Sequence, residues 1–153
     1  MILKEEVQIP LDRTTVFNAL NDTDILQQSI PGCEELKHVG DNELEATVVV
    51  KFGPVKASFN SNVTLDPSGG PELFKLAGSG DAGVAGFAKG GADVHLSEND
   101  EGTLLNYEVN IDISGKLAQV GSRLIEGTSK RLAKKFFSNF EEALLSRQTG
   151  TPT

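Results

Sequence analysis

Hydrophobic and polar residues alternate along most of the first two thirds of the chain, which is typical of half-buried strands. Residues 2–9 form the first alternating segment, and Pro10 ends it. Turn sequences rich in glycine, proline, asparagine and aspartate separate the later segments at regular intervals. We expect further strands near residues 33–38, 43–52, 55–66, 72–79, 86–97 and 103–113, which form an antiparallel meander.

The remaining segments have the spacing of helices. Asp12 is a suitable N-cap for a short helix over residues 13–20, and a second short helix follows over residues 23–29. Over residues 116–147 apolar side chains recur every three or four positions, which predicts one helix of about 30 residues, about 45 Å long. Its apolar stripe consists of Leu117, Val120, Leu124, Leu132, Phe136, Phe140 and Leu144.

The order of these elements predicts a fold class. A sheet with one apolar face and a helix with one apolar stripe bury both when the sheet wraps around the helix. We therefore expect an α+β helix-grip fold, with a seven-stranded curved antiparallel sheet around a long C-terminal helix and two short helices after the first strand. The length fits a single domain over residues 1–147, followed by a disordered tail over residues 148–153.

The segment GSGDAG, from Gly78 to Gly83, matches the dinucleotide-binding pattern GxGxxG. That pattern binds phosphate when a strand precedes it and a helix follows it within a βαβ unit. Here the following residues, VAGFAKGGADVHL, are rich in glycine and then alternate, which is typical of a strand. We therefore interpret the segment as a flexible hairpin tip and expect it to act as a mobile lid.

Small residues gather where this hairpin is expected to face the long helix. One face of the strand near residues 86–97 begins with Gly86, Ala88, Gly90 and Ala92, and the first half of the helix is also small. Because small side chains face small ones, we expect a ligand-binding cavity of roughly 300–1,000 Å³, unless the helix lies closer to the sheet there. The predicted lining is Phe17, Ile30, Phe52, Ala57, Phe59, Leu76, Phe87, Ala88, Gly90, Tyr107, Val109, Ile111, Leu117, Val120, Gly121 and Leu124. The predicted mouth and lid are Gly53, Pro54, Gly80, Asp81, Gly83, Val84 and Gly86.

Charge and composition exclude several classes of protein. The net charge of −8 argues against nucleic acid as a partner, and no run of about 18 apolar residues is present to span a membrane. Cys33 is the only cysteine, which suits a cytoplasmic protein without a disulfide. The predicted mouth is less acidic than the rest, so it is either ordinary solvated charge or a surface for peripheral contact with an anionic membrane or an acidic partner. The cations Lys130, Arg131, Lys134 and Lys135 form either a solvated helix face or a partner surface.

The titratable residues do not assemble a catalytic or metal site. His38 and His95 occupy outward-facing positions of their predicted strands, so we expect neither a nucleophile–histidine pair nor a metal site. Tyr107 is the only inward-phased residue with a titratable side chain. It could orient a ligand by a hydrogen bond, or be an ordinary core residue with a satisfied hydroxyl. We expect no catalytic residue and no cofactor beyond a bound apolar molecule.

Four segments carry a family resemblance: SIPGCEEL, FGPVKASF, GSGDAGVAGFAKGGADVHL and ISGKLAQVGSRLIEGTSKRLAKKFFSNF. They resemble the CoxG family of carbon monoxide dehydrogenase subunits, which belongs to the START/Bet v 1-like (SRPBCC) superfamily. The resemblance implies a small accessory protein of a molybdenum hydroxylase system that serves the enzyme at the membrane, where an apolar ligand such as a quinone or lipid would suit it. Some members carry a C-terminal extension with a membrane anchor, whereas this chain ends in TGTPT.

The sequence therefore favours a non-catalytic protein that binds an apolar molecule and helps to recruit a membrane-linked oxidoreductase. We expect a monomer or weak dimer. Two alternatives remain open at this point. One is a cavity enzyme of the polyketide cyclase/aromatase type, and the other is an assembly factor with a filled core and no ligand.

Overall fold

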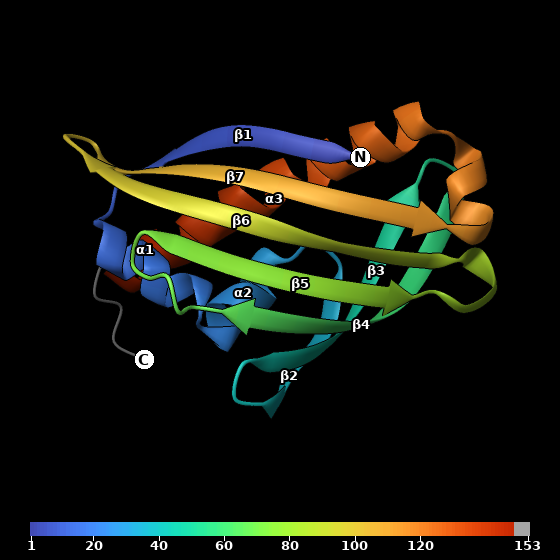
Figure 1. The fold of residues 1–153 in the computed structure, drawn as a ribbon, viewed down its shortest axis with the longest axis horizontal. Coiled ribbons are helices and arrows are strands. Elements are labelled where there is room, and N and C mark those ends of the chain that lie inside the picture. Colours follow the sequence, from blue (N-terminus) through green and yellow to red (C-terminus); the bar gives the residue numbers. More distant parts are fainter. Residues whose placement is uncertain (149–153) are drawn as a thin grey trace.

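The computed structural model describes residues 1–148, and its elements follow the predicted order (Figure 1). The strands are β1 (Ile2–Ile9), β2 (Cys33–Gly40), β3 (Glu43–Phe52), β4 (Val55–Asp66), β5 (Leu73–Asp81), β6 (Phe87–Asn99) and β7 (Gly102–Ser114). The α-helices are α1 (Arg13–Leu20), α2 (Thr23–Ser29) and α3 (Ser122–Gln148), and the short 3₁₀ turns are η1 (Gly83–Ala85) and η2 (Gly115–Val120). The predicted α+β helix-grip fold is confirmed.

The seven strands form one antiparallel sheet in the order β1-β7-β6-β5-β4-β3-β2. Consecutive strands from β2 to β7 pair with each other, and β1 closes the other side by pairing with β7. Helix α3 runs diagonally across one face of this sheet and contacts both β1 and β3, which belong to its two halves (Figure 1). The sheet therefore curves around the helix.

Two hydrophobic cores fill the space between sheet and helices. The main core lies at the end that carries α1, α2 and the C-terminal half of α3, and it includes Ile9, Val16, Ile25, Phe74, Leu105, Phe140 and Leu144. The second core lies at the opposite end, beside the β3–β4 turn and η2, and consists of Phe52, Ala57, Phe59, Leu117 and Ile125. Both ends of the sheet are thus packed against helical elements.

The predicted start of the long helix is wrong. Residues Gly115–Val120 form the 3₁₀ turn η2, and α3 begins only at Ser122. Gly121 separates the two with a φ of +101°, a backbone conformation outside the α-helical range. The break lets Leu117 turn into the second core. At the other end α3 includes Gln148, which the predicted tail contained, and residues 149–153 of that tail lie outside the described residues.

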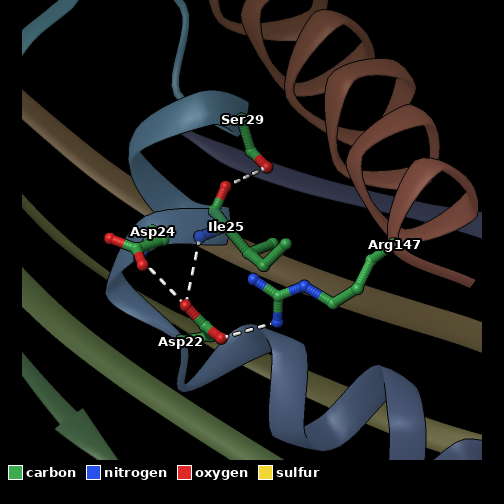
Figure 2. A network of polar contacts seen from close by, with 5 residues as sticks. All are labelled: Asp22, Asp24, Ile25, Ser29 and Arg147. Carbon is green, nitrogen blue, oxygen red and sulfur yellow. Dashed lines mark hydrogen bonds and ion pairs between the residues drawn. The ribbon is translucent and has the colours of Figure 1, made fainter. Parts of the chain in front are cut away.

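A polar network ties α2 to the C-terminal end of α3 (Figure 2). The Asp22 carboxylate caps α2 by accepting hydrogen bonds from the N–H groups of Asp24 and Ile25, and its other oxygen lies 2.8 Å from a guanidinium nitrogen of Arg147. Partial burial raises the pKa of Asp22, but the hydrogen bonds from Arg147 and the backbone and the Arg147 charge together lower it below 3.8. The buried Ser29 hydroxyl donates to the Ile25 carbonyl at 2.6 Å.

We expect Asp22→Ala to lower the free energy of unfolding by about 1–2 kcal/mol, because it removes both the N-cap and the ion pair. Arg147→Ala removes only the exposed ion pair and should cost about 0.2–1 kcal/mol. Since the folded-state pKa of Asp22 is lowered, its contribution is present above the unfolded pKa of about 4 and is lost as the pH falls through the folded value. Urea unfolding at pH 7 measures the loss of stability in each variant, and the same measurement at pH 3 tests the pH dependence. Equal losses for the two variants at pH 7 would contradict the capping role.

Candidate ligand cavity

The inner face of the sheet lacks side chains where β5 and β6 meet. Gly78 lies directly opposite Gly90, and Gly80 lies opposite Ala88, so nothing larger than a methyl group projects from these four positions. Next to them, β7 contributes bulky inward residues. The small residues therefore leave a shallow hollow in an otherwise apolar surface.

A backbone contact requires glycine at one of these positions and leaves little room at another. A Cβ atom added to Gly90 would lie 2.2 Å from the carbonyl oxygen of Asn110 on β7, so the two backbones are too close for any side chain at this position. At Gly78 an added Cβ would lie 3.0 Å from the carbonyl oxygen of Asn62 on β4. The close approach of β6 and β7 therefore requires glycine at position 90, and the hollow on the inner face follows in part from this requirement.

A cavity of about 320 Å³ lies over this hollow. Ser129 and Leu132 of α3 line it on the helix side. Phe52 and Phe59 of the second core also line it, as do Leu76 and Val109, which pack against the main core. The cavity therefore lies between the two cores, under the N-terminal half of α3.

Part of the predicted lining is brought together in this cavity, namely Phe52, Phe59, Leu76, Ala88, Gly90, Val109 and Ile111, together with Gly80 from the predicted lid. The prediction missed Val48, Ser61, Val63, Gly78, Ser79, Lys89, Gly91, Ala92, Asn110, Ile113, Ser129 and Leu132. Strand alternation would have found Val63 and Ile113, because both share the inward face with predicted neighbours. Leu132 belongs to the apolar stripe predicted for the long helix, so that stripe would have found it, whereas the polar Ser129 carries no such signal.

The other predicted lining residues lie elsewhere. Ala57 and Leu117 are in the second core, and Val120 packs against it. Leu124 covers the β3–β4 turn, where it is the nearest neighbour of a Cβ built on Gly53. The remaining residues also lie outside the cavity lining: Phe17 packs edge-on against Phe74, Ile30 packs against the main core, Phe87 is 40% exposed, and Gly121 forms the break before α3.

Tyr107 is buried in the main core rather than in the cavity. Its ring stacks on Phe137 at 5.2 Å, and its hydroxyl donates a hydrogen bond to the Glu5 carboxylate at 3.2 Å. Burial raises the pKa of Tyr107, and the charge and hydrogen bond of Glu5 raise it further, to about 12. The phenol is therefore protonated at neutral pH and satisfied by its own partner, so the interpretation as a core residue holds.

The cavity lining has few side chains that could take part in catalysis or bind a metal ion. Among its residues only Lys89 is ionisable, and its side chain has the outward phase and is exposed. General acid–base catalysis needs a titratable group within reach of the substrate. Within residues 1–148 no group of three or more His, Cys, Asp or Glu side chains could hold a metal ion. The arrangement is suited to contact with an apolar molecule.

The β5–β6 tip is a hydrogen-bonded turn. The Asp81 carboxylate accepts a hydrogen bond of 2.8 Å from the N–H of Gly83, and the N–H groups of Ala82 and Gly86 bond within the turn. Gly83 has a φ of +61°, so proline cannot replace it without strain. Residues Gly53, Pro54, Val84 and Gly86 lie at the same end of the molecule, in the β3–β4 and β5–β6 connections. Their action as a mobile lid stays a prediction.

The nucleotide pattern lies in a different context from the one that binds phosphate. Gly80 lies within β5, paired with Ser61 and Ala88, and only a three-residue 3₁₀ turn follows before β6. The Asp81 carboxylate also occupies the N–H of Gly83. No α-helix N-terminus is therefore presented to a phosphate at this segment.

The predicted partner surface lies on the outer side of α3. Lys130, Arg131, Lys134 and Lys135 are all exposed. Lys130 forms an ion pair with Glu126 at 3.2 Å, one helical turn away. This exposure agrees both with a solvated helix face and with a partner surface. No helix within residues 1–148 is both long and apolar enough to cross a membrane.

Titration of Tyr107 tests whether its hydroxyl is buried and bonded to Glu5. The signal is specific, because the chain has one tyrosine and no tryptophan. We expect absorbance at 295 nm in the native protein to titrate near pH 12, compared with about 10 for an unfolded tyrosine. Because the folded pKa is raised, the contribution of Tyr107 to stability is present below pH 10 and is lost as the pH rises toward 12. Tyr107→Phe is the control for the stability measurement, and a native midpoint near 10 would contradict the buried, Glu5-bonded hydroxyl.

Comparison with known proteins identifies related sequences and folds. The family model of CoxG, one of the carbon monoxide dehydrogenase subunits, matches residues 6–145. The crystal structure of a conserved protein from Geobacillus kaustophilus is similar with a TM-score of 0.89 and 25% identity, over 95% of this chain and 96% of that chain. A search of curated proteins found no match.

Two more distant structures share the fold. Ara h 8.0201 has a TM-score of 0.66 and 16% identity, over 95% of this chain and 98% of that chain. The Zhui aromatase/cyclase from Streptomyces sp. R1128 has a TM-score of 0.66 and 14% identity, over 96% of this chain and 94% of that chain. These similarities place the chain within the Bet v 1-like helix-grip fold.

Proposed function

The chain belongs to the CoxG family of carbon monoxide dehydrogenase subunits, and we propose that it is a non-catalytic binding protein for an apolar small molecule. The observation that carries this proposal is the cavity of about 320 Å³ between the glycine-rich strands and α3. This volume lies at the lower end of the range of ligand pockets, about 300–1,000 Å³. It suits a quinone ring or a short lipid chain.

The lining supports a ligand bound by shape and apolar contact. Bulky residues from β3, β4 and β7 surround the hollow, and the only polar side chains on its inward face are hydroxyls, such as those of Ser61 and Ser129. Burying apolar surface contributes about 25 cal/mol per Å², so an uncharged apolar molecule gains most from this site. An ionised ligand would lose its hydration without gaining a charged partner.

The family suggests a biological role for a protein that carries such a ligand. We propose that the protein is an accessory factor of a membrane-linked molybdenum hydroxylase system of the carbon monoxide dehydrogenase type, carrying a quinone or lipid and helping to bring the enzyme to the membrane. Lys130, Arg131, Lys134 and Lys135 on the outer side of α3 offer a surface for that enzyme. We propose that this role is performed at the inner face of the membrane.

A cavity enzyme of the cyclase type remains the second candidate, since the Zhui aromatase/cyclase shares the fold. That interpretation would require acid–base groups in the cavity, and the described lining has none with an inward titratable side chain. An assembly factor without ligand would require a filled core. Native mass spectrometry of the purified protein, followed by extraction of bound molecules, separates these alternatives from the proposed carrier.

We expect Ala88→Leu to weaken binding of a short-chain quinone analogue at least tenfold while changing the free energy of unfolding by less than about 1 kcal/mol, because the new side chain enters empty space. In a packed core the same enlargement costs about 1–3 kcal/mol. Calorimetric titration measures the binding, and thermal unfolding measures the stability.

The matched control is Ala77→Leu, on the exposed outer face of β5, which should leave binding unchanged. A large loss of stability in Ala88→Leu would show that this position is packed and would overturn the cavity. Unchanged binding in a stable Ala88→Leu would place the ligand elsewhere.

A further inference from the structure

Three connections meet at one end of the molecule and form a surface that the cavity does not explain. We call it the tip surface, and it comprises residues 51–56, 81–89 and 112–123. The turns η1 and η2 contact each other, and the β3–β4 turn lies against Leu124 at the start of α3. Figure 1 shows the β5–β6 tip projecting beyond the sheet at this end, opposite the end that carries α1.

The centre of the tip surface is apolar and exposed. Val84 is 89% exposed at the apex of the β5–β6 tip, and Phe87 beside it is 40% exposed. Val84 has the largest exposed fraction among the large hydrophobic side chains of residues 1–148. A single exposed apolar side chain is common on protein surfaces, so Val84 becomes informative only together with Phe87 and the charges around it.

Four of the five backbone N–H groups from Ala82 to Gly86 are already hydrogen-bonded. The N–H groups of Ala82, Gly83, Ala85 and Gly86 all donate hydrogen bonds to atoms within the tip. Transfer of a backbone N–H into an apolar medium is costly unless it is hydrogen-bonded. The tip can therefore enter a partly apolar interface without leaving these donors unpaired.

The charge of the tip surface is opposite to that of the rest of the chain. It carries five lysine and arginine side chains against two aspartates, a net charge of +3, so the remaining residues carry −11 and the whole chain −8. The five cations are Lys51, Lys56, Lys89, Lys116 and Arg123. Such a division orients the molecule with this end toward a negatively charged surface.

Two of these cations are held together without a counter-ion. Lys51 lies directly opposite Lys56 across the β3–β4 pair, and neither forms an ion pair within residues 1–148. Like charges directly opposite each other on neighbouring strands are destabilising. An external anion at this position would relieve the repulsion.

We propose that the tip surface docks on an anionic lipid bilayer, with Val84 entering the headgroup region and the lysines lying against lipid phosphates. A bilayer suits this surface better than an acidic protein, because anionic headgroups and apolar chains lie together in its interface and can meet the cations and Val84 at once. The proposal depends on the proposed function only for its biological purpose, since the second core at this end separates the tip surface from the cavity.

The test is cosedimentation of the full chain with vesicles of phosphatidylcholine and phosphatidylglycerol, compared with phosphatidylcholine alone, at low ionic strength. We expect binding only to the anionic vesicles, and its loss in high salt. Val84→Asp and the double variant Lys51→Glu/Lys56→Glu should each weaken binding about tenfold or more, because juxtamembrane cations and buried apolar area are the two sources of affinity.

Two matched controls make the result specific to the tip. Val39→Asp changes another exposed valine, 50% exposed near the β2–β3 turn at the opposite end, and should bind as the parent does. Lys130→Glu/Lys134→Glu makes the same change of charge on α3 and should have a much smaller effect. Circular dichroism confirms that each variant is folded.

Several results would overturn the proposal. One is equal binding of the tip and control variants, and another is no binding of the parent to anionic vesicles. A third is binding to soluble polyglutamate as tight as to vesicles and insensitive to Val84→Asp, which would assign the surface to an acidic protein. If the protein binds quinone in solution in any of these cases, only the membrane proposal fails and the proposed function is unaffected. If it binds vesicles as expected but binds no quinone, only the proposed function fails.

Discussion

The arrangement of this protein depends on how closely the backbones of β5, β6 and β7 approach one another. At Gly90 the carbonyl oxygen of Asn110 occupies the space that a Cβ atom would need, so this position cannot carry a side chain. Because Gly78 lies opposite Gly90, the hollow without side chains extends across two strands. A sheet built in this way cannot fill its own centre, and the apolar residues around the patch must pack toward either end.

Helix α3 spans the gap that results. Its C-terminal half contributes Phe140 and Leu144 to the main core, and its first turns contribute Ile125 to the second core. Packing of Leu144 in the main core, together with the exposed ion pair between Arg147 and Asp22, holds the far end of the helix against α2. The break at Gly121 directs its near end toward η2. A helix held at both ends covers the middle of the sheet without collapsing onto it.

The sequence was sufficient for the architecture because the strands alternate and the turns are marked by glycine, proline and acidic residues. Strand limits were accurate to within two residues, for instance residues 86–97 against Phe87–Asn99. The start of α3 was missed because an apolar periodicity cannot reveal that Gly121 adopts a positive φ and that Leu117 belongs to a separate turn. The cavity itself followed from small residues facing small ones, but the limits of its lining depend on where α3 begins and on which bulky residues pack together at each end.

The division into two cores also determines which part of the molecule opens most easily. The second core contains only five buried residues, whereas the main core contains many more and includes α1 and α2. Local opening free energies follow the apolar surface that an opening exposes, so the β3–β4 turn, η2 and the first turn of α3 form the less stable unit of the fold. If a bound molecule leaves through this end, its exchange rate would depend on the stability of the few side chains that form the second core.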